Sequence, residues 1–238
     1  MTISPAFSSV NSRDVLAIGL ETLPVAAIVS EVVKTQSHRE HKRQLNRDAL
    51  LRYDQFLSVL HKTIGSKRFF HSLGAMHYAI ALADRYQENL VQASAAGLFH
   101  DCGRLPKIEQ IEAEAKRRGV ALPPEDRLHP KVWHALLSAH IAEHDFGIAD
   151  GAVLRAIRVH PTGDAEMSRL DKIIFLADYV EPTRSFEGLN ELRASAEQDL
   201  DGTFRSALEH KLRHIQSLGR PMHPRSLRAL AAVGGSIT

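Results

Sequence analysis

Cysteine is almost absent from this sequence, because Cys102 is the only one among 238 residues. An internal disulfide is therefore excluded, and since unpaired thiols are typical of reducing compartments, we expect the protein to be cytoplasmic. Long apolar runs are also missing, and none approaches the about 20 residues that a membrane-spanning helix requires. The net charge is only +2, which gives no strong signal for nucleic-acid binding. We expect neither a membrane nor a nucleic acid as partner.

Strand signals are scarce as well, since aromatic residues make up only 6% of the chain and few β-branched residues alternate with polar ones. Apolar residues instead recur at helical spacing, and Asp150 and Ser168 stand where N-caps are expected. The predicted helices lie at residues 70–86, 91–101, 107–118, 133–144, 150–159, 168–179 and 189–218, the last one broken near Gly202. The sequence therefore predicts an all-α bundle joined by short loops.

The two ends of the chain differ in composition. Residues 1–50 form an appended N-terminal segment, which we expect to be partly helical or disordered and to end in a basic linker. The basic stretch itself, residues 34–52, is either a solvated linker or helix face, or an element that binds phosphate. Residues 51–238 contain the helical bundle, and we expect this domain to carry the function.

Histidine is in excess, with 14 in 238 residues. Imidazole is the commonest metal ligand in proteins, but the number alone proves nothing, so the neighbours must decide. His100 and Asp101 stand side by side after the small and apolar residues at 95–99. Ionisable groups in a buried helix are costly unless they are paired or bind a metal. The pair alone leaves two interpretations open, a metal site or a helix end capped by its own side chains.

Three further residues favour the metal site. Asp178 lies in an apolar helix, where a surface carboxylate is not expected, and His160 ends another apolar run. His71 is expected to open the helix at 70–86. Imidazoles and carboxylates from separate helices give a mixed nitrogen and oxygen set, which suits Fe, Mn, Co, Ni or Mg better than a zinc site selected by thiolates.

The order of these residues, His, then His-Asp, then Asp, resembles that of the HD superfamily of phosphohydrolases. The second half of the chain narrows the resemblance, because its segments IRVHPTG, MSRLDKIIFLADYVEPTRSFEGL and GRPMHPRSL are similar to signatures of the YqeK family. The similarity covers residues 52–230. It implies an HD-domain helical bundle, so that residues 51–238 would form an HD-type metal-dependent phosphohydrolase domain.

Members of the YqeK family are symmetrical diadenosine-tetraphosphate hydrolases, which yield two ADP and use iron. The resemblance therefore implies a dinucleoside polyphosphate or another nucleotide as substrate, and one or two divalent ions, with Fe favoured. By position it implies the metal ligands His71, His100, Asp101 and Asp178. Asp101 would also orient or deprotonate the attacking water, and Arg104 would assist catalysis as a cation.

The resemblance also implies which residues bind substrate. The family's middle histidine falls on His134 when the residues EHDFGI are aligned, whereas the alternative, His129, would need an insertion. The implied substrate-binding residues are Arg104, His134, His160, Pro161, Arg184, Gly219, Arg220, Pro221, Met222, His223 and Pro224. His134 and His160 would contact phosphate or hold a second ion. Arg104 replaces a lysine of the family and Pro161 a threonine, so rate or specificity is expected to differ.

Other interpretations stay open from the sequence. The same metal site would serve an HD-type nucleotidase or a (p)ppGpp-type hydrolase, and a nucleotide-binding regulatory protein with little turnover would keep the ligands. A homodimer is compatible with the sequence. Residues 7–33 resemble the tail of nicotinate-nucleotide adenylyltransferases through Ser8, Ser9 and Arg13. The rest of that domain is not found, so that activity is not expected, and an unrelated docking or disordered segment is the alternative.

Overall fold

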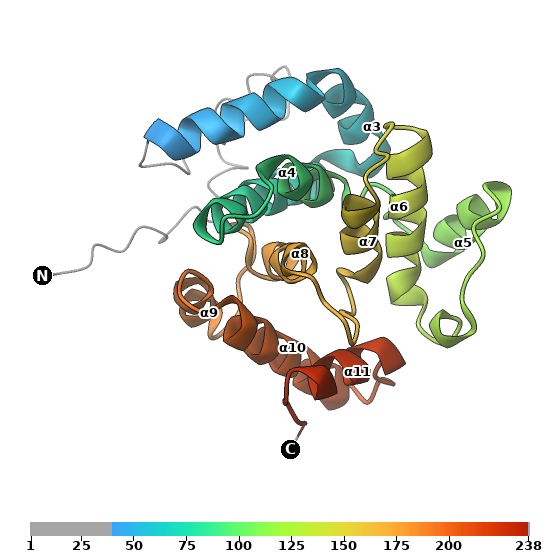
Figure 1. The fold of residues 1–238 in the computed structure, drawn as a ribbon. Coiled ribbons are helices and arrows are strands. Elements are labelled where there is room, and N and C mark those ends of the chain that lie inside the picture. The colour runs from blue at the N-terminus through green and yellow to red at the C-terminus, as the bar shows by residue number, and fades with distance from the viewer. Residues whose placement is uncertain (1–39, 238) are drawn as a thin grey trace, which may run out of the picture.

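The computed structural model of the chain describes residues 40–237. Every regular element in this part is helical, which confirms the predicted fold class. The elements are α3 (Glu40–Arg85), α4 (Leu90–Phe99), α5 (Ile108–Arg117), η2 (Pro124–Asp126), η3 (Pro130–Val132), α6 (Trp133–His144), α7 (Gly151–Val159), α8 (Arg169–Val180), α9 (Leu189–Ala196), α10 (Leu200–Ser217) and α11 (Pro224–Ala232). In Figure 1, α4 and α8 lie at the centre, with α3 above them and α9, α10 and α11 below.

Polar side chains fix where several of these helices begin. Asn89, Asp150 and Ser168 each accept hydrogen bonds from backbone N–H groups of the first turn that follows. Such bonds satisfy donors that have no partner within the helix. The N-caps that the sequence predicts at Asp150 and Ser168 are therefore confirmed.

The helical tract at 189–218 is broken at a different place from the one that the sequence predicts. The break was expected near Gly202, but α9 ends at Ala196 and α10 begins at Leu200. The reason is Asp199, whose side chain caps α10 and accepts a hydrogen bond from the Gly202 N–H at 2.9 Å. Gly202 thus lies in the first turn of α10 and does not interrupt it.

Helix α3 is longer than the predicted helix at 70–86 and bends at Gly65. The φ angle of Gly65 is 75°, a left-handed value that glycine adopts without a clash from a Cβ atom. His71 therefore lies shortly after this bend and does not open the helix as expected. Since α3 passes through residue 50 without interruption, the division of the chain at residue 50 stays a prediction, and the N-terminal calls at residues 1–39 lie outside the described residues.

Helix α4 is the centre of the core and contacts α3, α6, α7 and α8. Its residues from Ala93 to Phe99 are all buried. The small side chains allow a close approach to α3, since a Cβ atom at Gly97 would lie only 2.7 Å from the Cα atom of Met76. This close packing of α4 on α3 places His100, at the end of α4, against His71.

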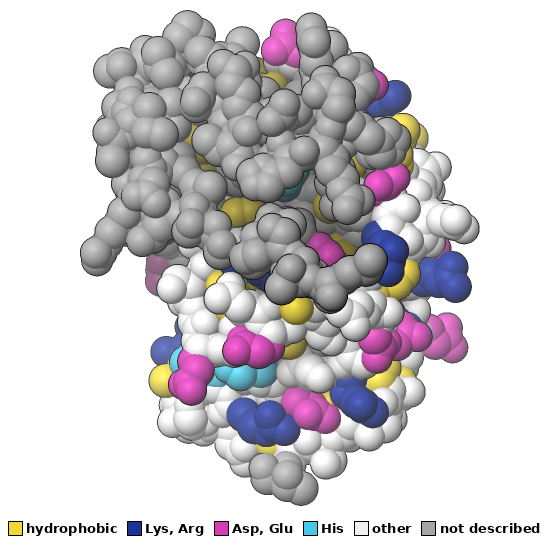
Figure 2. All heavy atoms as spheres, turned by 90° about the vertical axis from the view of Figure 1, so that its left-hand side faces the viewer, with side chains coloured by type: hydrophobic (Ala, Val, Ile, Leu, Met, Phe, Trp, Pro, Cys, Tyr) yellow, Lys and Arg dark blue, Asp and Glu magenta, His cyan; other side chains and the backbone are white. Residues whose placement is uncertain are grey.

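None of the described helices is long and apolar enough to cross a membrane. On the face shown in Figure 2, acidic and basic side chains are interspersed and do not gather by sign. This mixed surface agrees with the small net charge of +2.

Candidate metal centre

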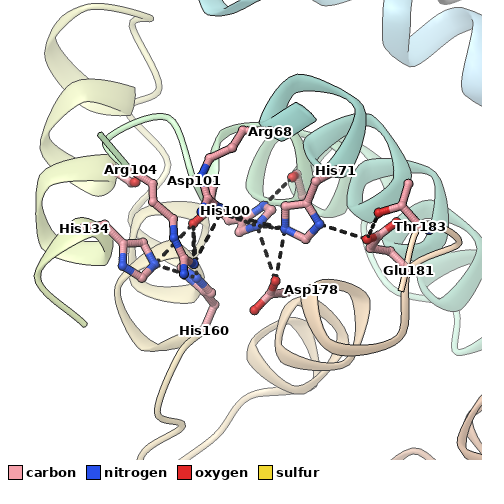
Figure 3. A network of polar contacts seen from close by, with 12 residues as sticks. Arg68, His71, His100, Asp101, Arg104, His134, His160, Asp178, Glu181 and Thr183 are labelled. Carbon is pink, nitrogen blue, oxygen red and sulfur yellow. Dashed lines mark hydrogen bonds and ion pairs between the residues drawn. The ribbon is translucent and has the colours of Figure 1, made fainter. Parts of the chain in front are cut away.

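Four histidines and two aspartates come together where α3, α4, α6, α7 and α8 meet (Figure 3). Every one of these side chains is buried, with an exposed fraction of at most 7%. The six residues are His71 on α3, His100 and Asp101 at the end of α4, His134 on α6, His160 at the end of α7 and Asp178 on α8. The structure thus brings together all of the metal ligands that the sequence implies, and adds two histidines that were assigned to substrate.

The first group contains the four implied ligands. The Nε2 atoms of His71 and His100 are 3.0 Å apart, and each lies 3.8 Å from Oδ2 of Asp101. Oδ1 of Asp178 lies 3.1 Å from the Nε2 atom of His71 and 3.7 Å from that of His100. Ligand atoms of His71, His100 and Asp101 lie close enough to one another to hold one ion, with Asp178 beside them.

A second group shares Asp101 with the first. Its other oxygen, Oδ1, lies 3.2 Å from Nε2 of His134 and 3.8 Å from Nε2 of His160. These two Nε2 atoms are 3.3 Å apart. These three residues also offer ligand atoms close enough to hold one ion. The two groups together could therefore hold two ions, one on each side of the Asp101 carboxylate.

Backbone carbonyl groups orient three of the imidazoles. The Nδ1 atoms of His100, His134 and His160 lie 2.8, 2.8 and 2.7 Å from the carbonyl oxygen three residues earlier in each case. A carbonyl oxygen can only accept, so Nδ1 carries a proton, and in the neutral form of the ring Nε2 has the lone pair. This tautomer is the one that binds metal through Nε2, and the donor set therefore fits a divalent ion.

His71 is oriented by Glu181, which sequence reasoning missed. Nδ1 of His71 lies 2.9 Å from Oε1 of Glu181, a fully buried carboxylate that also accepts hydrogen bonds from the backbone N–H and the hydroxyl of Thr183. Gly74 leaves room for it, because a Cβ atom there would lie 2.5 Å from Oε2 of Glu181. The position of Glu181 in the sequence could have revealed it, because an acidic residue just past the end of an apolar helix interacts unfavourably with the negative end of the helix dipole.

The two aspartates of the site are held in the ionised form. Burial raises the pKa of Asp101, but the charges of His100 and His134 outweigh it and keep the pKa well below the usual range. Burial acts in the same direction on Asp178, where Arg184 and His71 outweigh it and again keep the pKa well below the usual range. Buried carboxylates that stay charged in this way attract a cation.

The imidazoles differ from one another in charge. Burial opposes a charge on His71, but hydrogen bonds to Asp178 and Glu181 outweigh it and raise its pKa to about 9. Burial lowers the pKa of His100, and it lowers that of His160 well below the usual range with help from the charge of His100. In the absence of a metal, a proton on His71 therefore offsets part of the negative charge of the aspartates.

Three arginines surround the two aspartates. A guanidinium nitrogen of Arg68 lies 2.9 Å from Oδ2 of Asp101, and one of Arg104 lies 3.5 Å from Oδ1 of the same carboxylate. Arg184 donates to Oδ1 of Asp178 at 2.6 Å. Arg104 and Arg184 were expected here from the sequence, whereas Arg68 was missed. Its spacing could have revealed it, because it precedes His71 by three residues and so lies on the same face of α3.

The remaining residues that were assigned to substrate are Pro161 and residues 219–224. Pro161 follows His160 directly. The loop at 219–224 joins α10 to α11, and its first three residues are exposed. His223 in this loop is buried, and its Nε2 atom donates to Oδ1 of Asp126 at 2.9 Å while its Nδ1 atom accepts from the N–H of Arg225. Both ring nitrogens thus have protein partners, and contact between this loop and substrate stays a prediction.

Comparison with known proteins places the chain in a family. The model of the HD domain matches residues 68–183, a range that includes every residue of the two metal groups. A symmetrical bis(5'-nucleosyl)-tetraphosphatase of Bacillus subtilis is 30% identical over 72% of this chain and 91% of that protein. One of Halalkalibacterium halodurans is 34% identical over the same shares of both chains. The chain belongs to the HD-domain family of symmetrical bis(5'-nucleosyl)-tetraphosphatases.

The solved structure of a similar protein supports the fold of this chain. The crystal structure of a predicted HD superfamily hydrolase involved in NAD metabolism, from Clostridium acetobutylicum, is 36% identical. It superposes with a TM-score of 0.72 and covers 76% of this chain and 96% of that one. The all-α HD fold that the sequence predicts is thereby confirmed. Membership of the HD-domain family also implies a divalent metal, for which the two histidine and aspartate groups provide ligands.

Proposed function

We propose that this chain hydrolyses diadenosine tetraphosphate symmetrically to two ADP at the centre formed around Asp101. The observation that carries the proposal is a buried site of four histidines and two aspartates in a chain whose relatives bear the name of this activity. The proposed substrate is inferred from the names of these relatives, and the proposed reaction type is inferred from the site and the HD domain.

The residues divide the chemistry between them. A bound divalent ion lowers the pKa of a water molecule and offsets the negative charge of a phosphate group. His71, His100, Asp101 and Asp178 are proposed to hold such an ion. Asp101 has a second oxygen directed at His134, so it can orient the attacking water or accept its proton.

Arginine side chains are proposed to bind the polyphosphate. Arg68, Arg104 and Arg184 now interact with the carboxylates of Asp101 and Asp178. When these carboxylates serve as metal ligands, their hold on the guanidinium groups weakens, and the groups can turn to phosphate oxygens that accept paired hydrogen bonds. Phosphoryl transfer depends mainly on such positioning and on cations around the spreading charge.

We further propose iron as the resident metal, the cytoplasm as the compartment and a homodimer as the assembly. A nitrogen and oxygen ligand set without thiolates supports iron, although Mn, Co, Ni and Mg share this preference. The single buried cysteine supports a reducing compartment. Sedimentation of the purified protein tests the homodimer directly.

Incubation of the purified protein with diadenosine tetraphosphate, Fe²⁺ and a reductant tests the proposed activity. ADP as the sole product is expected. A mixture of ATP and AMP would show that cleavage is asymmetrical, and (p)ppGpp or mononucleotide turnover without activity on the tetraphosphate would move the chain to another HD-type reaction.

The ligand assignment needs its own test. Asp178→Ala should lose bound metal and activity together, and retention of stoichiometric metal in this variant would contradict the assignment. His160→Ala tests the second group. If both groups are filled in the unchanged protein, the metal content of this variant should fall from two ions per chain to one. One ion in the unchanged protein would show that only one group binds metal.

A further inference from the structure

Lys211 extends from α10 onto α8. Its Nζ atom lies 4.9 Å from the ring centroid of Phe175 and 5.8 Å from that of Tyr179. Both rings belong to α8, the helix that carries Asp178. Tyr179 is the next residue after this aspartate, so the lysine ammonium group is held beside the site by the two rings.

The charges that act on Lys211 are those of the metal centre. Burial lowers its pKa to about 8, while Asp178 and Asp101 favour its charge and Arg184 and Arg104 oppose it. These four residues come from α8, from the loop after α8 and from the end of α4. The ammonium group is therefore close enough to the metal centre to interact electrostatically with its charged residues.

Lys211 differs from those arginines in its partners. Arg68, Arg104 and Arg184 each pair with a carboxylate of the site. Within residues 40–237, no carboxylate lies at ion-pair distance from Lys211, whose recorded contacts are the faces of the two rings. A partly buried ammonium group that interacts with two guanidinium groups is costly without an anion. A negatively charged ligand at the site would remove this cost.

A purely structural role explains less. The aliphatic part of the side chain packs on the rings, but methionine would pack there equally well and without a desolvated charge. The charge itself needs an explanation, and it points to a multiply charged anion that approaches the metal centre from the side of α10.

We propose that Lys211 binds the polyphosphate chain of the substrate, at a phosphoryl group next to the one held at the metal centre. It would thus set the affinity for the tetraphosphate more than the rate of bond cleavage. The identity of the substrate rests on the proposed function, whereas the binding of a polyphosphate anion at Lys211 does not.

The test compares Lys211→Met and Lys211→Arg with the unchanged protein, all loaded with metal. Calorimetry measures the dissociation constant of inorganic tripolyphosphate, and steady-state kinetics give KM and kcat for diadenosine tetraphosphate. Lys211→Met should raise the dissociation constant and KM about tenfold or more, because a hydrogen bond to a charged group has about this value in binding. Lys211→Arg keeps the charge and should stay within about threefold, and kcat should change little in either variant.

Arg213→Met provides the matched control. Arg213 lies on the same helix, is exposed, and pairs with Glu209 at 3.1 Å. Arg213→Met removes one positive charge from the chain, as Lys211→Met does. An equal loss of affinity in both variants would therefore show a general electrostatic effect and overturn the proposal. Unchanged tripolyphosphate binding in Lys211→Met would overturn it as well.

The outcomes also separate this inference from the proposed function. If the unchanged protein binds tripolyphosphate and Lys211→Met does not, but diadenosine tetraphosphate is not cleaved, the substrate is wrong and the anion site stands. If Lys211→Met cleaves the tetraphosphate with the same KM as the unchanged protein, the proposed function stands and the anion site at Lys211 is wrong. Should Lys211→Met melt below the assay temperature, Lys211→Gln replaces it with the same expectations.

Discussion

The contact between Glu181 and His71 leads to a specific prediction for metal affinity. Glu181 is fully buried and accepts three hydrogen bonds, from Nδ1 of His71, from the backbone N–H of Thr183 and from the Thr183 hydroxyl. Glu181→Gln keeps the shape of the side chain but leaves one accepting oxygen in place of two. At least one of the three donors then faces an amide N–H₂ group, and the negative charge behind His71 is lost.

The expected magnitude follows from these bonds. A buried donor without a partner costs about 1–3 kcal/mol, which lowers the free energy of unfolding. A carboxylate that orients a metal-binding histidine typically contributes about 10- to 100-fold to metal affinity. Glu181→Gln should therefore bind metal about 10- to 100-fold more weakly, with His71, His100, Asp101 and Asp178 all still present.

Competition with a chromogenic chelator measures this affinity, and Thr183→Val is the matched control. Thr183→Val removes one donor to Glu181 but leaves the bond to His71 intact, so its metal affinity should stay within about threefold of the unchanged protein. Metal affinity in Glu181→Gln equal to that of the unchanged protein, in a variant that melts normally, would refute the role of Glu181. An equal loss in both variants would show that the packing of this corner matters rather than the bond to His71.

Three further predictions concern pH, packing and substrate binding. Because the pKa of His71 is raised to about 9, a metal ion that binds at neutral pH must displace a proton from this imidazole. The affinity for the metal should therefore rise up to about tenfold per pH unit from pH 7 to about pH 9 and then level off. Competition with a chelator measures this change. The stability that protonated His71 gives the metal-free fold changes in the opposite direction: it is complete below about pH 6.5 and is lost as the pH rises through about 9, and flat thermal melts over this range would contradict it. Gly97→Ala places a Cβ atom 2.7 Å from the Cα atom of Met76 and should cost about 1–3 kcal/mol in urea denaturation, whereas Gly151→Ala, with open space around it, should be nearly neutral. Arg68→Gln should raise KM about tenfold in steady-state assays while Arg68→Lys recovers part of it, and a normal KM in Arg68→Gln would exclude a contact with substrate.

Three of the residues that meet in the candidate metal centre could be predicted from the sequence because each stands in a context that a surface residue does not share. Asp178 lies in an apolar helix, and His100 and Asp101 follow a run of small buried residues. The order of the residues along the chain then supplied the family. Local patterns of this kind survive folding, because the helices that carry them are set by their own sequence and by caps such as Ser168.

What the sequence did not reveal depends on contacts between distant elements. Glu181 matters because α8 returns it to His71, 110 positions earlier in the chain. Arg68 matters because it pairs with Asp101, 33 positions later in the chain. The loop around His223 shows the opposite case, in which a residue assigned to substrate by resemblance is held by Asp126, 97 positions away. Local patterns could draw attention to Glu181 and Arg68, but they do not indicate the distant partner in any of these three pairings.

The tautomers at the second group bear on the number of metal ions. Nδ1 of His160 donates to a carbonyl oxygen at 2.7 Å, and burial holds the pKa of this imidazole well below the usual range. A neutral ring with its proton on Nδ1 has only a lone pair at Nε2, and phosphate oxygens are acceptors too, so the two cannot hydrogen-bond to each other. Nε2 of His160 can therefore accept a hydrogen bond, for which Nε2 of His134 lies at 3.3 Å, or bind a cation, and Asp101 Oδ1 lies 3.8 Å from it. Of the two roles that the sequence left open for this histidine, the geometry favours a ligand to a second ion over direct contact with phosphate.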